Sequence, residues 1–468
     1  MAETARQDVS PGTDDGDEEL FGLSDEVVRA VADAIDHQQP DEVQALTRDL
    51  HAADLADLVE RLNPEKRVIL IRTFSPEVLA ETLSHLDGQV REELIEALPA
   101  RDIAAALTEL DSDDALEIIE DLDEEQQREV LAQLPMPDRL LVQQGLTYPE
   151  ESAGRLMQRE FVMVPQFWTV GETIDHLRES QDSEDLPEEF YDIFVVDPKM
   201  KLVGSVALSR VMRARRRVRI AELMKTDIKR IPADMDQEEV AFLFRQYGLV
   251  AAPVVDDDGR LLGMITVDDI VRIVGAEAEE DMLKLAGVQE SDLFSAVLST
   301  TRSRITWLLL NLGTALVASV VIGQFEEAIT QIVALAVLMP IVSALGGNAG
   351  TQTLTVAVRA LAMREISASN ALRVIGKEVM VGLINGLVLA AIIGTIAFVW
   401  FGSWEIGAII AAAMVLNMIV AGFFGALIPM GLERLGVDPA VASSVFLTAL
   451  TDAVGFFAFL GLATVFLL

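Results

Sequence analysis

Asp452 is a lone carboxylate in an otherwise apolar stretch from Val441 to Leu468. A carboxylate in the hydrocarbon core of a membrane is costly unless it is partnered, and ionisable residues at that depth commonly mark routes for ions or protons. Ser444 and Thr448 precede Asp452 at four-residue spacing, so a helix would place all three on one face. This spacing predicts a small, polar helix face along which a cation passes.

A second polar stripe occurs in the apolar stretch that begins near Ile329. It consists of small or uncharged polar residues, namely Ser343, Gly347, Asn348, Gly350, Thr351 and Gln352. Glycines in membrane helices commonly serve close helix packing, which is the competing interpretation for Gly346, Gly347 and Gly350. Packing does not account for Asp452, and no Arg or Lys occurs at a comparable depth to pair with it.

Five apolar stretches are long enough to cross a membrane, since about 20 residues span its hydrocarbon core. They are Ile305 to Gln324, Ile329 to Ala344 and onward, Val379 to Trp400, Ile406 to Ile428, and Val441 to Leu468. The basic residues after Thr300 all lie at alternate ends of these stretches, and the loops at Glu326 and Glu405 carry none. The positive-inside rule then predicts a cytosolic N-terminal region and an outside Leu468 in a plasma (inner) membrane protein. The acidic first residues do not resemble a signal peptide.

The chain has 468 residues and a net charge of −39, no cysteine and four histidines, all before the apolar stretches. A metal site in the membrane would therefore use oxygen ligands, which favours Mg, Ca or Mn over zinc or copper. Residues 1–300 hold 67 acidic and 29 basic residues, so nearly all of the imbalance lies there. Two interpretations stay open: solubility, or a sensor in which divalent cations bridge repelling carboxylates. So negative a chain is not expected to bind nucleic acid.

The region before the spans divides into four parts. Residues 1–20 are expected to be a disordered acidic tail. Residues 21–145 contain short amphipathic segments in units of roughly 24 residues, opened by Leu55, Val78 and Ile103, which predict a helical superhelix of the solenoid type. Residues 146–275 form two similar α/β copies, and residues 276–300 an amphipathic connecting helix, which either transmits movement to the membrane part or merely joins it.

The two α/β copies resemble a tandem CBS module, each with a strand, an acidic turn, a second strand and a closing helix. CBS pairs often bind adenine nucleotides, and Thr266 and Asp269 match the spacing of the ribose contacts, while Ala207 and Arg210 in the first copy do not. ATP is therefore a possible ligand, although Asp269 could instead cap its helix. No catalytic triad is visible, so the module is expected to bind rather than catalyse. The basic run from Arg213 to Arg219 is interpreted as a solvated linker.

Three motifs stand out in the order of the predicted parts: YPEESAGRLM at 148–157, PIVSALGGNAGTQ at 340–352 and LTD at 450–452. Together they make the chain similar to the MgtE family of magnesium channels. This resemblance covers residues 21–468. It implies a homodimer in membrane lipid, a pore on the two-fold axis lined by the second and fifth spans, and closure when cytosolic Mg²⁺ binds the acidic domains and the connecting (plug) helix.

Mg²⁺ usually keeps several waters and is held by one or two carboxylates. Two copies of Asp452 would flank a hydrated ion about 7 Å across, so we expect Asp452 to be the selectivity ligand, with Thr448, Ser444, Gly347, Asn348, Gly350 and Thr351 around the ion. By resemblance, the regulatory Mg²⁺ ligands would be Asp236, Glu238, Asp269, Glu277, Glu280 and Asp281. Gly248 and Arg272 stand where relatives often have acids, which leaves the number of regulatory ions open.

Three other functions compete with a channel. An intramembrane aspartyl enzyme needs a second carboxylate at depth, and Glu365, Glu378 and Glu433 lie at span boundaries. A nucleotide-responsive anchoring protein needs no polar stripe in its spans, yet two are present. A cation-coupled transporter or exporter of divalent cations would use Asp452 as a proton site, and the sequence leaves that alternative open. The prediction is a non-enzymatic Mg²⁺ channel or transporter.

Overall fold

The computed structural model describes residues 23–180, 186–187, 190–288, 297–440 and 443–468. These residues form two compact units, which are divided between Val274 and Gly275. The predicted tail at residues 1–20 lies outside the described residues.

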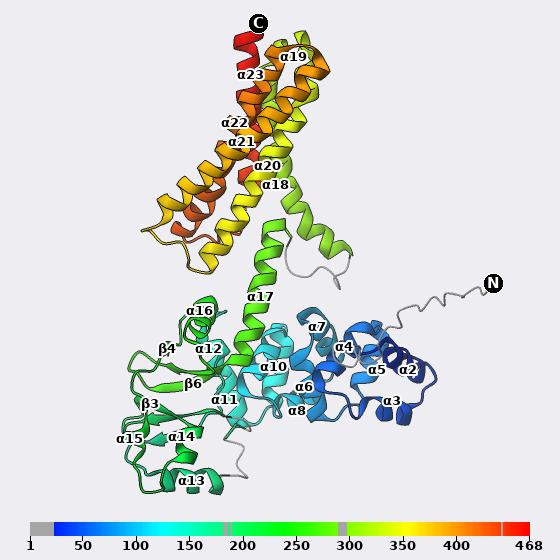
Figure 1. The fold of residues 1–468 in the computed structure, drawn as a ribbon. Helices are drawn as coiled ribbons and strands as arrows, with labels where there is room; N and C mark the ends of the chain where they lie inside the picture. The colour runs from blue at the N-terminus through cyan, green and yellow to red at the C-terminus, as the bar shows by residue number, and fades with distance from the viewer. Residues whose placement is uncertain (1–22, 181–185, 188–189, 289–296, 441–442) are drawn as a thin grey trace, which may run out of the picture. The chain divides into compact units, whose positions relative to one another are not determined.

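The first part of the first unit is a row of paired short helices (Figure 1). Four pairs begin at 24-residue intervals, at Ala52, Pro76, Ala100 and Glu124, which confirms the predicted superhelix. The helices are α2 (Asp25–Asp36), α3 (Pro40–Thr47), α4 (Ala52–Arg61), α5 (Pro64–Ile71), α6 (Pro76–His85), α7 (Gly88–Ala97), α8 (Ala100–Leu107), α9 (Ser112–Glu120), α10 (Glu124–Gln133) and α11 (Met136–Gly145).

Capping residues and leucine-rich faces explain these short helices. Asn63 and Ser75 accept hydrogen bonds from the first turns of α5 and α6, and a proline follows each as the first helical residue. The inward faces then share one apolar core that includes Leu58, Leu83 and Ile119, each fully buried or nearly so. A helix of about ten residues is marginal alone, so stacking on its neighbours stabilises each one.

The CBS region contains two three-stranded sheets of the same topology, which confirms the predicted tandem α/β repeat. In each sheet the first strand pairs parallel to the second and the second pairs antiparallel to the third. The strands are β1 (Met163–Pro165), β2 (Asp192–Val196), β3 (Leu202–Ala207), β4 (Ile231–Pro232), β5 (Ala251–Val255) and β6 (Leu261–Thr266). The accompanying helices are α12 (Ala153–Leu156), α13 (Val170–Glu179), α14 (Leu208–Arg213), α15 (Ile220–Leu223) and α16 (Gln237–Tyr247).

One continuous helix, α17 (Val267–Ala286), closes the second CBS copy and forms the first half of the predicted connecting helix. Residues 289–296 of that prediction lie outside the described residues. The part of α17 from Gly275 onward belongs to the second unit, where Leu285 packs against a cluster that contains Leu354 and Leu447.

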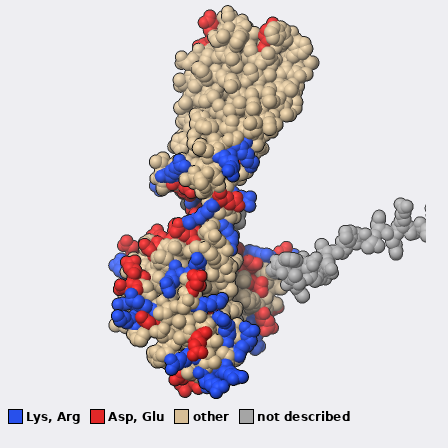
Figure 2. Space-filling view, turned by 60° about the vertical axis from the view of Figure 1, so that its left-hand side comes forward, with Lys and Arg blue, Asp and Glu red and all other residues tan. Residues whose placement is uncertain are grey.

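Among its described residues, the second unit contains five helices that are long and apolar enough to cross a membrane, as predicted. They run side by side in Figure 1 as α18 (Val297–Gly323), α20 (Val333–Ala362), α21 (Ala371–Phe401), α22 (Trp404–Arg434) and α23 (Ser443–Leu467), with the short α19 (Glu326–Gln331) between the first two. The face drawn in Figure 2 has a broad uncharged band on this unit, with charged side chains visible at its two ends. Such a band matches the hydrocarbon layer of a bilayer.

Glycines let α22 approach its neighbours closely. A side chain at Gly407 would meet the backbone oxygen of Gly394 in α21 at 2.7 Å, and one at Gly425 would meet that of Gly350 in α20 at 2.9 Å. Small residues at crossing points are the common means of helix association in membranes. These glycines let α22 lie close to α21 and α20, and α23, which carries the other polar stripe, packs against both α20 and α22.

Candidate functional site

The structure brings the two predicted polar stripes together at Asp452. The hydroxyl of Ser343 in α20 donates a hydrogen bond to Oδ1 of Asp452 in α23 at 2.6 Å, across 109 residues of sequence. Both residues are half-buried. Among the residues that the structure describes, no Lys, Arg or His forms an ion pair with Asp452. Asp452 is therefore held in place by a neutral donor and keeps its capacity to attract a cation.

The other predicted residues of α23 follow Asp452 toward the start of the helix. Thr448 is exposed and donates to the backbone oxygen of Ser444 at 2.9 Å, while Ser444 is half-buried. Thr451 is fully buried and donates to the backbone oxygen of Leu447. One accessible face of α23 thus carries Asp452, Thr448 and Ser444, while Thr451 faces the helix bundle.

The predicted residues of α20 divide into two groups. Asn348 and Thr351 are exposed, and Gly347 has open space where a side chain would lie. Gly350 is buried, and a side chain there would meet Leu447 of α23 at 3.0 Å. Gly350 therefore supports close packing of α20 on α23, while the other three lie on accessible surface of the single chain.

Asn417 and Glu378 are buried polar residues of the second unit that the sequence did not place in a site. Asn417 in α22 is fully buried and donates from Nδ2 to the backbone oxygen of Val342 at 2.9 Å. Glu378 in α21 is 9% exposed and accepts a 3.4 Å hydrogen bond from Thr353. The signal for Asn417 was present as a single amide in the apolar run MVLNMIV. The sequence places Glu378 directly before an apolar stretch, and hydropathy alone does not indicate that its side chain is buried.

Near the start of α17 the first unit contains a concentrated group of carboxylates. Asp269 accepts hydrogen bonds from Thr266 at 2.8 Å and from Arg272 at 2.5 Å, so the two predicted nucleotide contacts bind each other. Arg272 also donates to Asp114 of the helical region at 3.0 Å. We name the contact between the start of α9 and the start of α17 the acidic junction; it contains Asp111, Asp113, Asp114, Glu160, Asp268, Asp269 and Arg272.

Burial and mutual repulsion make these carboxylates hard to ionise. Burial, with Glu160 and Asp114 nearby, raises the pKa of Asp111 to about 6. Burial also raises the pKa of Asp113 well above its usual value, with Asp269 as the next cause. The pKa of Asp114 is raised by burial although Arg272 opposes the shift. A positive ion at this junction would lower the cost of keeping the carboxylates charged.

The remaining predicted regulatory residues lie in two other places. Asp236 is exposed and caps α16 by accepting from the backbone N–H of Glu238 at 2.9 Å, and Glu238 is also exposed. In the second unit, Lys284 pairs with Glu280 on the same helix and with Asp438 at 2.8 Å. Burial raises the pKa of Asp281, and the adjacent Asp438 adds to the shift. Glu277 lies one turn before Glu280, half-buried.

Lys284 thus joins α17 to the loop that leads into α23. This pairing with Asp438 was not predicted, because the two residues are 154 positions apart. The pair places the acidic residues of α17 beside the segment that leads to Ser444, where the polar face of α23 begins.

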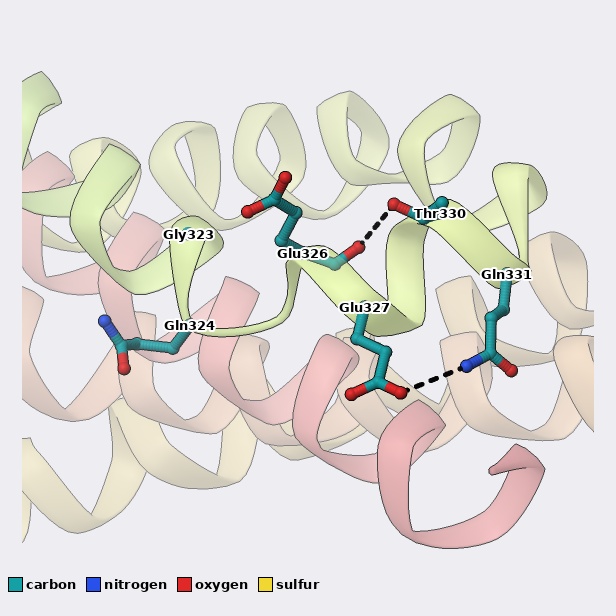
Figure 3. A pocket seen from close by; sticks show the side chains of 6 residues that line it. All are labelled: Gly323, Gln324, Glu326, Glu327, Thr330 and Gln331. Carbon is teal, nitrogen blue, oxygen red and sulfur yellow. Dashed lines mark hydrogen bonds between the residues drawn. The ribbon is translucent and has the colours of Figure 1, made fainter.

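An open hollow lies at the end of α18, where α19 begins (Figure 3). It encloses about 540 Å³ and is lined by Gly323, Gln324, Glu326, Glu327, Thr330 and Gln331. Thr330 donates to the backbone oxygen of Glu326 at 2.8 Å, and both acids are exposed to solvent. Within the described part of the chain, no three carboxylate or imidazole groups converge closely enough to hold a bare metal ion.

Three family models match the chain in the order of its parts. A model described as "MgtE intracellular N domain" matches residues 50–151, one described as "CBS domain" matches 220–276, and one described as "Divalent cation transporter" matches 339–462. The last of these covers both stripes and Asp452.

Curated relatives agree with these matches. The chain is 31% identical over 328 residues to a magnesium transporter MgtE of Bacillus subtilis, covering 70% of this chain and 72% of the relative. It is 33% identical over 323 residues to a magnesium transporter MgtE of Thermus thermophilus, covering 68% and 71%. A crystal structure of the cytosolic domain of the Mg²⁺ channel MgtE in complex with ATP aligns with a TM-score of 0.49 at 31% identity, covering 53% of this chain and 99% of that one. The chain belongs to the MgtE family of divalent cation transporters.

Proposed function

We propose that two copies of this chain form a Mg²⁺-selective channel in the plasma (inner) membrane, with the ion path on the dimer axis and Asp452 as the selectivity ligand. The observation that carries the proposal is the carboxylate of Asp452, which lies within a membrane-spanning helix and is supported by the Ser343 hydroxyl at 2.6 Å. A carboxylate in such a place is retained where it pairs with a counter-ion or lines a water-filled path. Rings of carboxylates are a general means of cation selection.

The polar surface of the single chain supports a dimer. Polar side chains in membrane spans face the bundle interior or water rather than lipid. On α20 and α23, however, several are exposed in the single chain, namely Asn348, Thr351, Gln352, Thr355 and Thr448. A second copy that faced the same surface would remove these groups from lipid and enclose a path lined by amides and hydroxyls, whose oxygens can accept hydrogen bonds from the water around Mg²⁺.

The ends of the spans support a direction. Arg302, Arg359 and Arg434 lie at one set of ends, while the acids Glu326 and Glu405 lie at the other. The positive-inside rule assigns the arginine side to the cytosol, which places Leu468 outside. The exposed Glu326 and Glu327 of the hollow would then meet ions on the outer side.

Cytosolic Mg²⁺ would close the channel by binding between carboxylates that repel one another without it. Asp281 and Asp438 are one such pair at the loop before α23, because the charge of Asp438 adds to the effect of burial in raising the pKa of Asp281. Asp236, Glu238, Asp269, Glu277 and Glu280 are further ligand candidates. ATP is a proposed second ligand at Thr266 and Asp269, and it would have to displace Arg272 from Asp269.

Mg²⁺ uptake into liposomes tests the proposed pore. The variant Asp452→Asn keeps the size of the side chain and removes its charge, so we expect Mg²⁺ uptake to fall at least about 100-fold, as loss of a charge-assisted contact implies. Glu405→Gln is the matched control, because Glu405 lies at a helix end and accepts from Ser403 at 2.8 Å. Uptake by Asp452→Asn at the level of Glu405→Gln would remove Asp452 from the pore.

Planar bilayer recordings separate the channel from a cation-coupled transporter or exporter. Discrete current steps that persist without a proton gradient, and that Mg²⁺ on the side of the first unit suppresses, are expected for the channel. Mg²⁺ flux that stops when the proton gradient is collapsed would instead support a proton role for Asp452.

A further inference from the structure

We propose that Asn417 is a positioning residue for the ion site, which sets the register of α20 against α23 so that Ser343 and Asp452 meet. The proposal depends on the function assigned to Asp452 above. Asn417 lies on neither polar stripe and belongs to α22, the helix behind them.

The contacts of Asn417 place it between the two stripe helices. Its Nδ2 donates to the backbone oxygen of Val342, the residue directly before Ser343. On α20, a side chain at Gly346 would overlap the Asn417 amide; on α23, one at Gly455 would approach Nδ2 at 2.8 Å. The two glycines therefore form a slot that fits the amide from both sides.

This slot lies one helical turn from the ion site on both helices. Gly346 is three residues after Ser343, and Gly455 is three residues after Asp452, so each glycine shares a helix face with its polar partner. The seam between α20 and α23 thus has two polar layers, the pair Ser343 with Asp452 and the amide of Asn417. A sliding movement of either helix that broke one layer would break the other.

The energetics of Asn417 argue against a role in stability alone. Its Oδ1 atom is buried without a hydrogen-bond partner in the structure, a state that costs free energy. The oxygen of Val342 lies inside α20, where it also has a backbone donor one turn later. A leucine of similar shape would fill the slot without burying polar atoms, so packing by itself favours leucine over asparagine.

The test replaces Asn417 with leucine in the full chain and measures the Mg²⁺ dependence of uptake into liposomes. In Asn417→Leu, we expect the half-saturating Mg²⁺ concentration to rise about 10-fold, the effect of losing one positioning hydrogen bond, while thermal stability in detergent is unchanged or higher. A purely structural role would lower the stability and the maximal uptake, and leave the half-saturating concentration unchanged.

Two further variants complete the test. In Gly346→Ala, the added methyl group on α20 would overlap the amide of Asn417. The half-saturating Mg²⁺ concentration should therefore rise as it does in Asn417→Leu. Met414→Ala is the control, because Met414 is fully buried on the same helix one turn away; it should lower stability and leave the half-saturating concentration unchanged. If Asp452→Asn is inactive while Asn417→Leu and Gly346→Ala keep the wild-type Mg²⁺ dependence, the role of Asn417 is refuted and that of Asp452 stands. Full uptake by Asp452→Asn would overturn both.

Discussion

At the scale of single residues, the role proposed for Asp452 depends on its having a hydroxyl group rather than a cationic side chain as its partner. A strong partner such as Arg would satisfy the carboxylate and compete with a passing cation, whereas a hydroxyl fixes its orientation and leaves its charge. Ser343 supplies that hydroxyl from a different helix. The pair therefore couples the geometry of the site to the packing of α20 on α23.

Removing this hydroxyl should weaken the site without abolishing it. In Ser343→Ala, Asp452 keeps its charge but loses a charge-assisted donor that water in the path replaces in part, so we expect the half-saturating Mg²⁺ concentration for uptake to rise about 5-fold. Ser319→Ala on α18 is the control, since Ser319 is exposed and donates only to the backbone of its own helix at 2.9 Å. Equal Mg²⁺ dependence in the two variants would mean that the 2.6 Å contact does not orient Asp452.

At the scale of elements, a buried ladder of charge pairs connects successive repeats of the helical region. Arg67 in α5 pairs with Glu93 in α7 at 2.8 Å, and 24 residues later Arg91 in α7 pairs with Glu117 in α9 at 2.7 Å. Both arginine side chains are 6% exposed, while Glu93 and Glu117 are partly exposed. Since each repeat contacts mainly its neighbours, these pairs fix the spacing of one helix pair on the next.

Removing the charge pairs of one arginine should destabilise the contact between two neighbouring repeats. Arg91 also pairs with Asp121 at 2.6 Å, so Arg91→Ala leaves two carboxylates without their cation. We expect the free energy of local opening of α7 and α9 to fall by about 2 kcal/mol, below the value for a fully buried pair because the carboxylates are partly exposed. Hydrogen exchange of the full chain measures this. Arg101→Ala, at an exposed pair, should change opening by less than about 0.5 kcal/mol, and equal effects of the two variants would contradict the ladder.

The elements were predictable where one physical constraint dominates. The bilayer requires long apolar helices, so hydropathy gave five spans, and stacking of incomplete units gave the 24-residue repeat. Pairings across long sequence separations did not follow from local patterns: Ser343 with Asp452, Lys284 with Asp438, and Asn417 between two glycines all depend on tertiary packing. Periodicity also could not separate Gly347 from Gly350, which are three residues apart: Gly350 faces Leu447 of α23, while Gly347 faces open space.

At the scale of the whole molecule, the excess negative charge has a strong local effect where the fold brings carboxylates close together. The acidic junction does so between the helical and CBS regions, where the backbone N–H and hydroxyl of Ser112 also bind Glu160 at 3.2 and 2.9 Å. Arg272 contributes a fixed positive charge there through Asp114 and Asp269. The guanidinium of Arg272 therefore neutralises part of the negative charge of the acidic junction, as a free cation could.

Without Arg272 the junction should depend on protons or on added cations. Burial raises the pKa of Asp111 to about 6, and also raises the pKa values of Asp113 and Asp114. A carboxyl group whose pKa is higher in the folded state than the usual value near 4 stabilises the contact when protonated. For Asp111 this stabilisation is lost as the pH rises through about 6. In Arg272→Gln, we expect α9 to exchange its amide hydrogens about 10-fold faster at pH 7.5, after correction for intrinsic rates, as loss of a partly buried charge pair implies. Lowering the pH to 5 or adding millimolar Mg²⁺ should restore slow exchange.

Arg260→Gln is the matched control for this prediction, because Arg260 is an exposed arginine of the same unit that reaches Asp258 only at 3.9 Å. Its exchange in α9 should equal that of the unsubstituted chain at every pH. If Arg272→Gln behaved like Arg260→Gln at pH 7.5, the carboxylates of the junction would be neutralised by their own protons, and Mg²⁺ would have no charge there to bind. Fast exchange in Arg272→Gln that Mg²⁺ slows would instead show that the guanidinium and the divalent cation perform the same electrostatic task.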